Sequence, residues 1–321
     1  MPQPTASDVH VNAPLTAISI AFMQDQSGFI ARKVFPTVPV NKQSDRYYRY
    51  DKKQWFRSDA RMRAPGTESA GSGFTVDNTP TYYAGVRAVH KDVDDQIRAN
   101  ADSVINPDRD ATEFVTRDLM LEQEQQWAST YFTTGIWTGS TTGGDITPAT
   151  LWDVGGSTPI EDLRAQKRAV HQKTGFMPNK MVIGPEVWDV LQDHPDFLER
   201  IKFTQTAIVA PSLLAAVLEL DEILIANALE DVNQEGAAED LQYIFGKRCL
   251  LTYSAPRPSL LHPSAGYTFA WNGLFGANAA GMRMSRFRME HLKSDRVEGE
   301  AAYDHKLVAA ECGAFFDGVI S

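Results

Sequence analysis

The stretch NPDRDATEFVTRDLMLEQEQQWASTYFTTG, residues 106–135, is the clearest structural signal in the chain, because it predicts one long helix. Asn106 is a favoured N-cap, Pro107 suits the first helical position, and Gly135 is the expected stop. Apolar residues recur at helical steps of three and four: Ala111, Phe114, Val115, Leu119, Met120, Trp127 and Tyr131. At about 1.5 Å per residue the helix would run roughly 40 Å. Because the stripe is narrow and residues 122–126 are almost wholly polar, we expect a strut on a sheet, with one face open to water or a partner.

The composition limits the possible classes of protein. The 321 residues suggest about two domains, and a hydrophobic content of 43% is sufficient for a core. The balance of 41 acidic against 31 basic residues argues against a protein whose main role is to grip nucleic acid. The sequence lacks both a run of about 18 apolar residues and a signal-peptide pattern, so we expect no membrane contact. Cys249 and Cys312, the two cysteines, suit a reducing cytosol, although a single disulfide stays open.

Residues 1–45 are predicted to be an N-terminal arm. Two apolar patches, residues 15–23 and 29–40, are each too short to form a domain. Residues 13–23 could form an amphipathic turn and helix, whereas Pro36 and Pro39 impose an extended path. We expect this arm to lie over another surface.

Residues 46–90 predict an extended β-hairpin loop. Two extended runs flank the Gly/Ser-rich residues 66–73, and an isolated hairpin of this kind is marginally stable in water. Basic residues alternate with aromatic ones, which is typical of arms that bind single-stranded nucleic acid. The acidic remainder of the chain favours the alternative, an oligomerisation arm. The candidate inter-subunit residues here are Lys52, Lys53, Trp55, Phe56, Arg57, Arg61 and Arg63.

Residues 141–280 predict a compact α/β domain. The Gly/Thr-rich residues 138–157 lack the spacing of a phosphate loop and are interpreted as a linker into this domain. A helix follows over 158–174, with a capping box at Thr158 and Glu161. Further elements alternate along the chain, as in an α/β unit. We expect strands at 180–183, 222–226, 243–253 and 267–271, and helices at 186–193 and 211–220.

An acidic rim lies within this domain. Residues 219–240 contain eight carboxylates and no basic residue. Glu222, Glu230 and Asp231 are our candidates for a face that receives a basic partner, while a simple solvated rim is the alternative.

The C-terminal residues are predicted to return to the first domain. Residues 282–292 form a strand in which the alternation slips phase, so we expect a bulge, and Ser294 and Asp295 allow a turn. Residues 300–312 and 314–320 would then complete the sheet on which the long helix lies. The predicted fold is therefore α+β, with a peripheral domain of residues 91–140 and 281–321.

The sequence contains no recognisable catalytic motif. Hydrolase, zinc-protease and dinucleotide-binding fingerprints are absent, and the seven histidines are scattered. The run from His90 to Asp95, HKDVDD, lacks calcium-loop spacing and is interpreted as a solvated acidic turn. We predict no catalytic, cofactor or metal site, although a triad built from distant residues stays open.

One run carries a family resemblance. Residues 176–201, FMPNKMVIGPEVWDVLQDHPDFLERI, resemble the strand-turn-helix of the axial domain in tailed-bacteriophage major capsid proteins of the Hong Kong 97 type. LLAAVLELDEILIANA, KRCLLTYSAP and PSAGYTFAW follow in the order expected of that domain. The resemblance implies an N-terminal arm, an extended loop, a peripheral domain with a long spine helix, and an axial domain.

The function implied by this resemblance is self-assembly into an icosahedral shell around a double-stranded DNA genome. The expected partners are copies of the chain in hexamers and pentamers, a separate scaffold protein, a portal and, as an optional component, a cement protein. Packaged DNA would be contacted only weakly. The protein would reside in the virion after assembly in the host cytoplasm. Two alternatives remain, an encapsulin-like cargo shell and an oligomeric α+β enzyme.

Overall fold

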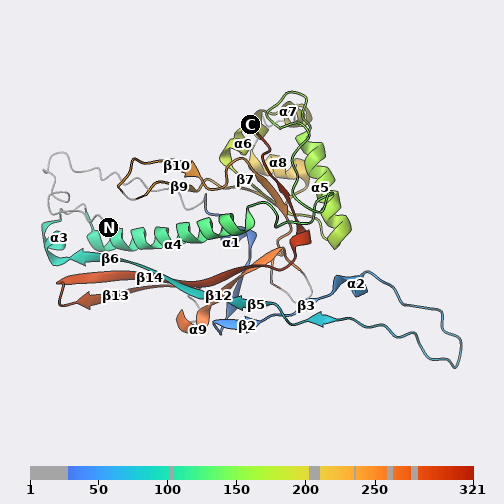
Figure 1. Ribbon diagram of the computed structural model, residues 1–321, viewed down its shortest axis with the longest axis horizontal. Helices are drawn as coiled ribbons and strands as arrows, with labels where there is room; N and C mark the ends of the chain where they lie inside the picture. The colour runs from blue at the N-terminus through green and yellow to red at the C-terminus, as the bar shows by residue number, and fades with distance from the viewer. Residues whose placement is uncertain (1–27, 102–104, 202–209, 235, 259–262, 276–280) are drawn as a thin grey trace.

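The computed structural model describes residues 28–101, 105–201, 210–234, 236–258, 263–275 and 281–321 (Figure 1). The predicted turn and helix at residues 13–23 therefore lie outside the described residues. Two sheets organise these residues, and a long helix runs along one of them and reaches the other. Mixed helix and sheet confirms the general α+β prediction.

The first sheet has five strands. β1 (Thr37–Val40) pairs in parallel with β12 (Gly266–Trp271), and β12 pairs antiparallel with β14 (Ser294–Leu307). β13 (Met282–Met289) and β6 (Gly85–Asp94) also pair antiparallel with the 14-residue strand β14.

Helix α4 (Pro107–Tyr131) lies on this sheet and confirms the predicted long helix. The Asn106 side chain accepts the Arg109 N–H at 3.2 Å, as an N-cap should. Phe132, not Gly135, follows the last helical residue, so the predicted stop was three residues late. Gly135 adopts a positive φ of 80° in the loop beyond. Gly299 of β14 allows α4 to approach the sheet closely, since a Cβ at this position would lie only 2.5 Å from Val115 Cγ1 of the helix.

The polar segment of α4 contributes to its buried face, which the sequence analysis did not identify. Gln123 and Glu124 are buried, at 4% and 1% exposure, whereas Phe114 is 54% exposed. Gln123 continues a four-residue step from Leu119 to Trp127, so it lies on the buried face. The polar residues Gln123 and Glu124 therefore face the core, whereas the apolar Phe114 is on the exposed face of the helix.

The predicted bulge and two predicted turns are absent from the described residues of the first sheet. The β13–β14 register runs without interruption, so no extra residue is inserted. The connection covers residues 290–293, where Lys293 has a positive φ of 49°, and Ser294 already belongs to β14. His90 to Asp94 lie in β6 rather than in an acidic turn, and Asp92 pairs with Arg296 at 2.7 Å.

The second sheet has four strands, β15 (Gly313–Phe316), β11 (Cys249–Thr252), β7 (Lys180–Ile183) and β8 (Glu222–Ile225), in that order. β7 and β8 are parallel, and the other pairs are antiparallel. Four helices accompany it: α5 (Pro159–Thr174), α6 (Pro185–Asp193), α7 (Pro195–Ile201) and α8 (Pro211–Leu218). β15 was expected in the first sheet but pairs with β11, because the chain leaves β14 through a short turn, η3 (Ala310–Cys312).

The segment predicted as a linker is instead packed. Trp152 is 1% exposed, and Ile146 forms a parallel bridge with Phe316. The capping box at Thr158 is also absent, because its side chain makes no cap; Asp196 of α7 accepts the Ile160 N–H at 3.2 Å instead.

A hydrophobic core lies between the two sheets and joins them. It combines Phe35, Trp127 and Phe132 with Leu250 and Phe315 of the second sheet. The predicted strand at 243–253 is divided between β11 and β10 (Leu241–Tyr243), which pairs with β9 (Leu229–Asp231) in a separate hairpin. This β9–β10 hairpin lies above α4 in Figure 1.

The remaining elements include a long extension. β2 (Ser44–Arg46) pairs with β5 (Thr81–Tyr83), and β3 (Arg49–Tyr50) pairs with β4 (Val76–Asp77). Beyond α2 (Lys52–Trp55), residues 56–75 project away from both sheets (Figure 1). Three short helices, α1 (Ala31–Val34), α3 (Asp95–Asn100) and α9 (Asn272–Phe275), complete the described chain.

Candidate assembly surface

The projecting residues 56–75 form a surface with little core of its own. Trp55 is 56% exposed, and its ring lies beside those of Tyr50 and Phe74, with ring centroids 6.2 and 5.7 Å away. Phe56 is 66% exposed and Met62 is fully exposed. If a second surface covered these large apolar side chains, their solvent-exposed area would be removed from water.

The predicted basic residues of the loop divide into anchored and outward groups. Lys52 forms an ion pair with Glu311 and donates to the Lys173 carbonyl at 3.1 Å, so it ties the loop base to η3 and α5. Phe56 also lies at the base, where its ring would be 2.9 Å from a Cβ added to Gly175.

The outward group consists of Lys53, Arg57, Arg61 and Arg63, which are all exposed. Arg57 pairs with Asp59 at 2.9 Å, and Arg63 donates to the Thr67 carbonyl, both within the loop. Such exposed pairs stabilise by only about 0–1 kcal/mol and can be exchanged for others.

The predicted acidic residues lie in two places, with Glu222 in β8 of the second sheet and Glu230 and Asp231 in β9. Glu222 is 3.7 Å from Lys180, and Glu230 accepts from the Gln125 side chain at 2.9 Å. Asp231 accepts the N–H groups of Asn233 and Asp240, which shapes the β9–β10 turn. In Figure 1 the β9–β10 hairpin and residues 56–75 lie at opposite sides, so the fold does not bring the two charged sets together within one subunit.

A buried carboxylate that the sequence analysis missed fixes the start of the described chain. Glu124 accepts the Ile30 N–H at 2.8 Å and the Ala31 N–H at 2.9 Å. Burial raises the pKa of Glu124 to about 7, against the opposing effect of these two N–H donors. The neighbouring Gln123 accepts from Arg32 Nε at 2.7 Å. The segment around α1 is thus held to α4 by a group that titrates near neutrality.

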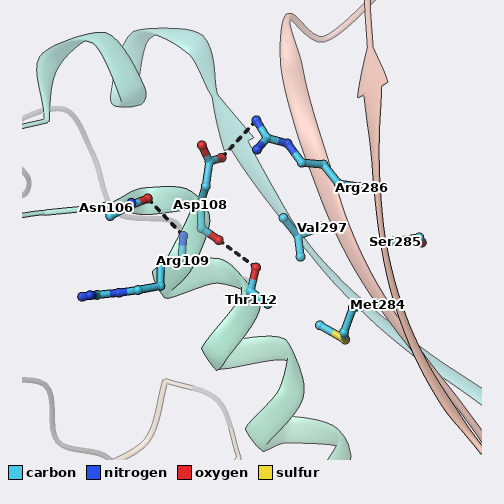
Figure 2. Close-up of a pocket in the computed structure, with 8 residues that line it drawn as sticks. All are labelled: Asn106, Asp108, Arg109, Thr112, Met284, Ser285, Arg286 and Val297. Carbon is cyan, nitrogen blue, oxygen red and sulfur yellow. Dashed lines mark hydrogen bonds and ion pairs between the residues drawn. The ribbon is translucent and has the colours of Figure 1, made fainter. Parts of the chain in front are cut away.

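A second feature not predicted from the sequence is a charged network at the N-terminal end of α4, beside a hollow of about 470 Å³ (Figure 2). Arg98 lies 2.8 Å from Asp108 and 2.9 Å from Asp295. Figure 2 shows Arg286 of β13 directed at Asp108, at 3.4 Å. The network contains Arg98, Arg286, Arg288, Asp95, Asp108 and Asp295. Hydrogen bonding to Arg286 lowers the pKa of Asp295. The network joins α3, α4 and the β13–β14 hairpin.

One buried Ser–His pair bears on the enzyme alternative. Ser157 Oγ lies 2.9 Å from His194 Nε2, and the Asp196 N–H donates to His194 Nδ1 at 3.1 Å. Since Nδ1 accepts, the proton of the neutral ring is on Nε2, which donates to Ser157. Burial lowers the pKa of His194 and keeps the ring neutral. A nitrogen that already carries a proton cannot withdraw one from Ser157, so the pair does not have the geometry of a nucleophile and its base.

Within the described ranges, His, Cys, Asp and Glu side chains form no group of three or more arranged to hold a metal ion. None of the helices described is both long and apolar enough to cross a bilayer. Cys249 and Cys312 are both free and buried, so the disulfide left open by the sequence is not formed.

The family model described as Phage major capsid protein E matches residues 141–254. The major capsid protein of Burkholderia phage BcepMu is 22% identical over 96% of both chains, and that of Pseudomonas phage JBD67 is 23% identical over 97% of both. The predicted resemblance to phage major capsid proteins is therefore confirmed.

Solved structures show the same fold. A phage-related protein from Bordetella bronchiseptica RB50 has a TM-score of 0.70 at 20% identity, covering 92% of this chain and 93% of that one. The mature capsid of bacteriophage PhiM1 has a TM-score of 0.61 at 12% identity, covering 97% and 92%. The SrpI encapsulin of Synechococcus elongatus has a TM-score of 0.56 at 11% identity, covering 97% and 94%.

Proposed function

We propose that this chain is the major capsid protein of a tailed phage of the Hong Kong 97 type, and that it self-assembles into the icosahedral shell around double-stranded DNA. In this proposal residues 1–45 are the N-terminal arm and 46–90 the extended loop. Residues 91–140 and 281–321 form the peripheral domain, and 141–280 form the axial domain. The packing of β15 against β11 gives the axial sheet one strand from the C-terminal part.

The observation that supports assembly most directly is the separation of the two charged sets. Residues 56–75 carry exposed cations and aromatic rings away from both sheets, and the β9–β10 hairpin, with Glu230 and Asp231, lies at the opposite side. Complementary surfaces that cannot meet within one subunit can meet between neighbours, where they set register as well as attraction. A closed ring of such head-to-tail contacts suits hexamers and pentamers.

The charge balance also suits a shell that must release its contents. Affinity for DNA comes chiefly from basic contacts to phosphates, and the net charge here is −10. We therefore propose that packaged DNA is held weakly, that the protein resides in the virion, and that it assembles in the host cytoplasm. A scaffold protein, a portal and an optional cement protein are further proposed partners. We propose no enzymatic activity, because Ser157 and His194 lack the required proton arrangement.

The test is assembly of a loop variant. Reversal of Arg57, Arg61 and Arg63 to Glu should change the free energy of unfolding of the free subunit by no more than about 0.5 kcal/mol relative to the parent. The reason is that exposed side chains contribute little to the stability of the fold. The same change should prevent shell formation in sedimentation with the scaffold, because the repulsion is repeated at every contact.

A matched variant with Gln at the same three positions separates loss of attraction from added repulsion. It should assemble partially and become more sensitive to salt. Normal yields of shells from the Glu variant would contradict docking by charge. Microscopy and the nucleic-acid content of the particle then distinguish a DNA-filled phage head from a cargo shell, and the absence of any particle would favour the oligomeric enzyme.

A further inference from the structure

The β9–β10 hairpin is oriented unusually on α4. Its register places Leu241 opposite Asp231, Gln242 opposite Glu230 and Tyr243 opposite Leu229. Because side chains alternate across a strand, Glu230 and Gln242 share one face, and that face is turned to α4, where Glu230 meets Gln125. The hairpin therefore presents its polar face to the helix.

The opposite face is apolar and uncovered in the described chain. Leu241 is 60% exposed and Tyr243 is 43% exposed. Asp231, opposite Leu241, also lies on this face, where its carboxylate accepts the N–H groups of Asn233 and Asp240. Leu229, partly buried, completes this face. Exposed apolar side chains grouped on one face are typical of a surface that another segment covers.

The described chain begins next to this hairpin. Gly28 packs on the residues that lead into β9, since a Cβ added to it would lie 3.2 Å from Asn227 Cβ and 3.5 Å from the Ala228 nitrogen. The following α1 is held by Glu124, so the position of residue 28 is fixed. The preceding 27 residues therefore enter the fold at the base of the hairpin.

The sequence of that segment matches the uncovered face. Residues 9–24 contain no Asp, Glu, Lys or Arg, and residues 15–23 read LTAISIAFM. Met23 and Leu15 are five and thirteen residues from Gly28, and can reach at most about 17 and 45 Å. The hairpin face extends about 10 Å from Ala228 to Asp231 at the rise of a strand, so residues 15–23 can span it.

We propose that residues 15–23 of the same chain dock on the outward face of the β9–β10 hairpin, against Leu229, Leu241 and Tyr243. Gly28 and α1 direct the segment to this face. The inference is independent of the proposed function, because it concerns a contact within one subunit.

The test is a disulfide between the two elements in the full-length subunit. The variant with Phe22→Cys and Leu241→Cys, oxidised at low protein concentration, should form an intramolecular cross-link seen as a mobility shift on a non-reducing gel. The native thiols do not interfere, because Cys249 and Cys312 are buried. The matched control pairs Phe22→Cys with Met62→Cys, at the exposed tip of the loop, and should not cross-link.

Absence of the cross-link, or equal cross-linking in the control, would overturn the proposal. Cross-linked dimers without the intramolecular product would also overturn it, because the occupant would then be a second copy. As a check that needs no thiol, Leu241→Asp in the full chain should raise chymotryptic cleavage at Phe22 by at least about tenfold, since cleavage follows the population of the open form. An unchanged cleavage rate would count against docking.

Discussion

Charged side chains lie near both ends of α4, but they differ in burial and in the kind of partner that each one has. At the N-terminal end, Asp108 belongs to a network of exposed or half-exposed charges in which every member has partners. Near the C-terminal end, Glu124 is buried and has two backbone N–H groups as its hydrogen-bond partners. The comparison teaches that the number of ion pairs is a poor guide to what stabilises this helix, because burial determines the cost of losing a partner.

The largest expected effect comes from removal of the buried carboxylate. Glu124→Ala leaves the N–H groups of Ile30 and Ala31 without acceptors, each at a cost of about 1–3 kcal/mol. We expect a loss of about 2–4 kcal/mol in the free energy of unfolding, which urea denaturation of the free subunit measures. Trypsin should also cut faster after Arg32 and Lys33, because α1 is no longer held. Parent-like stability together with parent-like cleavage would contradict this assignment.

The pH dependence of stability provides a sharper test of the same site. The folded pKa of Glu124, about 7, is higher than the ordinary value of 4.5, so the folded state binds the proton more tightly than the unfolded chain does. The stabilisation is complete below pH 4.5 and is lost as the pH rises to about 7, by roughly 3 kcal/mol at 1.36 kcal/mol per unit. Glu124→Gln should flatten the curve of stability in this interval. A parent-like slope in the Gln variant would assign the dependence to other groups.

A smaller effect is expected midway along the helix. Gly299→Ala adds a methyl group 2.5 Å from Val115 Cγ1 and 2.8 Å from Leu119 Cδ1, so α4 must move from the sheet. Overpacking of this kind costs about 1–3 kcal/mol. Thermal melting of the free subunit is the measurement, and Gly144→Ala, where nothing lies within 4 Å, is the control. Equal melting of both variants would show that α4 is not tightly seated there.

The smallest effect is expected at the exposed end. Arg286→Ala removes one partner from Asp108 and Asp295, but Arg98 remains beside both. We expect less than about 1 kcal/mol, and less still in high salt, because exposed pairs are screened. Denaturation at low and high salt measures this. A loss as large as that of Glu124→Ala would show that the two ends of the helix do not differ in the way described.

The sequence predicted local elements better than long-range packing. Asn106 and Pro107 marked the start of α4, and the apolar residues 181–183 marked β7, because caps and short apolar runs are local signals. The burial of Glu124 was missed although Leu119, Gln123 and Trp127 share a four-residue step, because the polarity of the segment was given more weight than its period. The placement of β15 could not be predicted, since GAFF fits a buried strand in either sheet.

The candidate surface was likewise predicted in part. The sequence identified the projecting loop and the acidic rim from composition alone. It could not show that Lys52 and Phe56 are engaged within the chain, because Glu311 and Gly175 are far away in sequence. Nor could it show the outward face of Leu241 and Tyr243, because the direction of a hairpin face depends on its tertiary contacts.

The paths of β14 and β15 also have a consequence for synthesis on the ribosome. β14 pairs with β6, β12 and β13, and β15 completes the other sheet, so both sheets require residues 294–316. Neither half can therefore finish folding while translation of the chain is under way, and we expect no subunit able to assemble before those residues emerge. Stalled nascent chains ending at residue 293 should remain fully sensitive to protease, and a resistant fragment would show that one half folds ahead of the other.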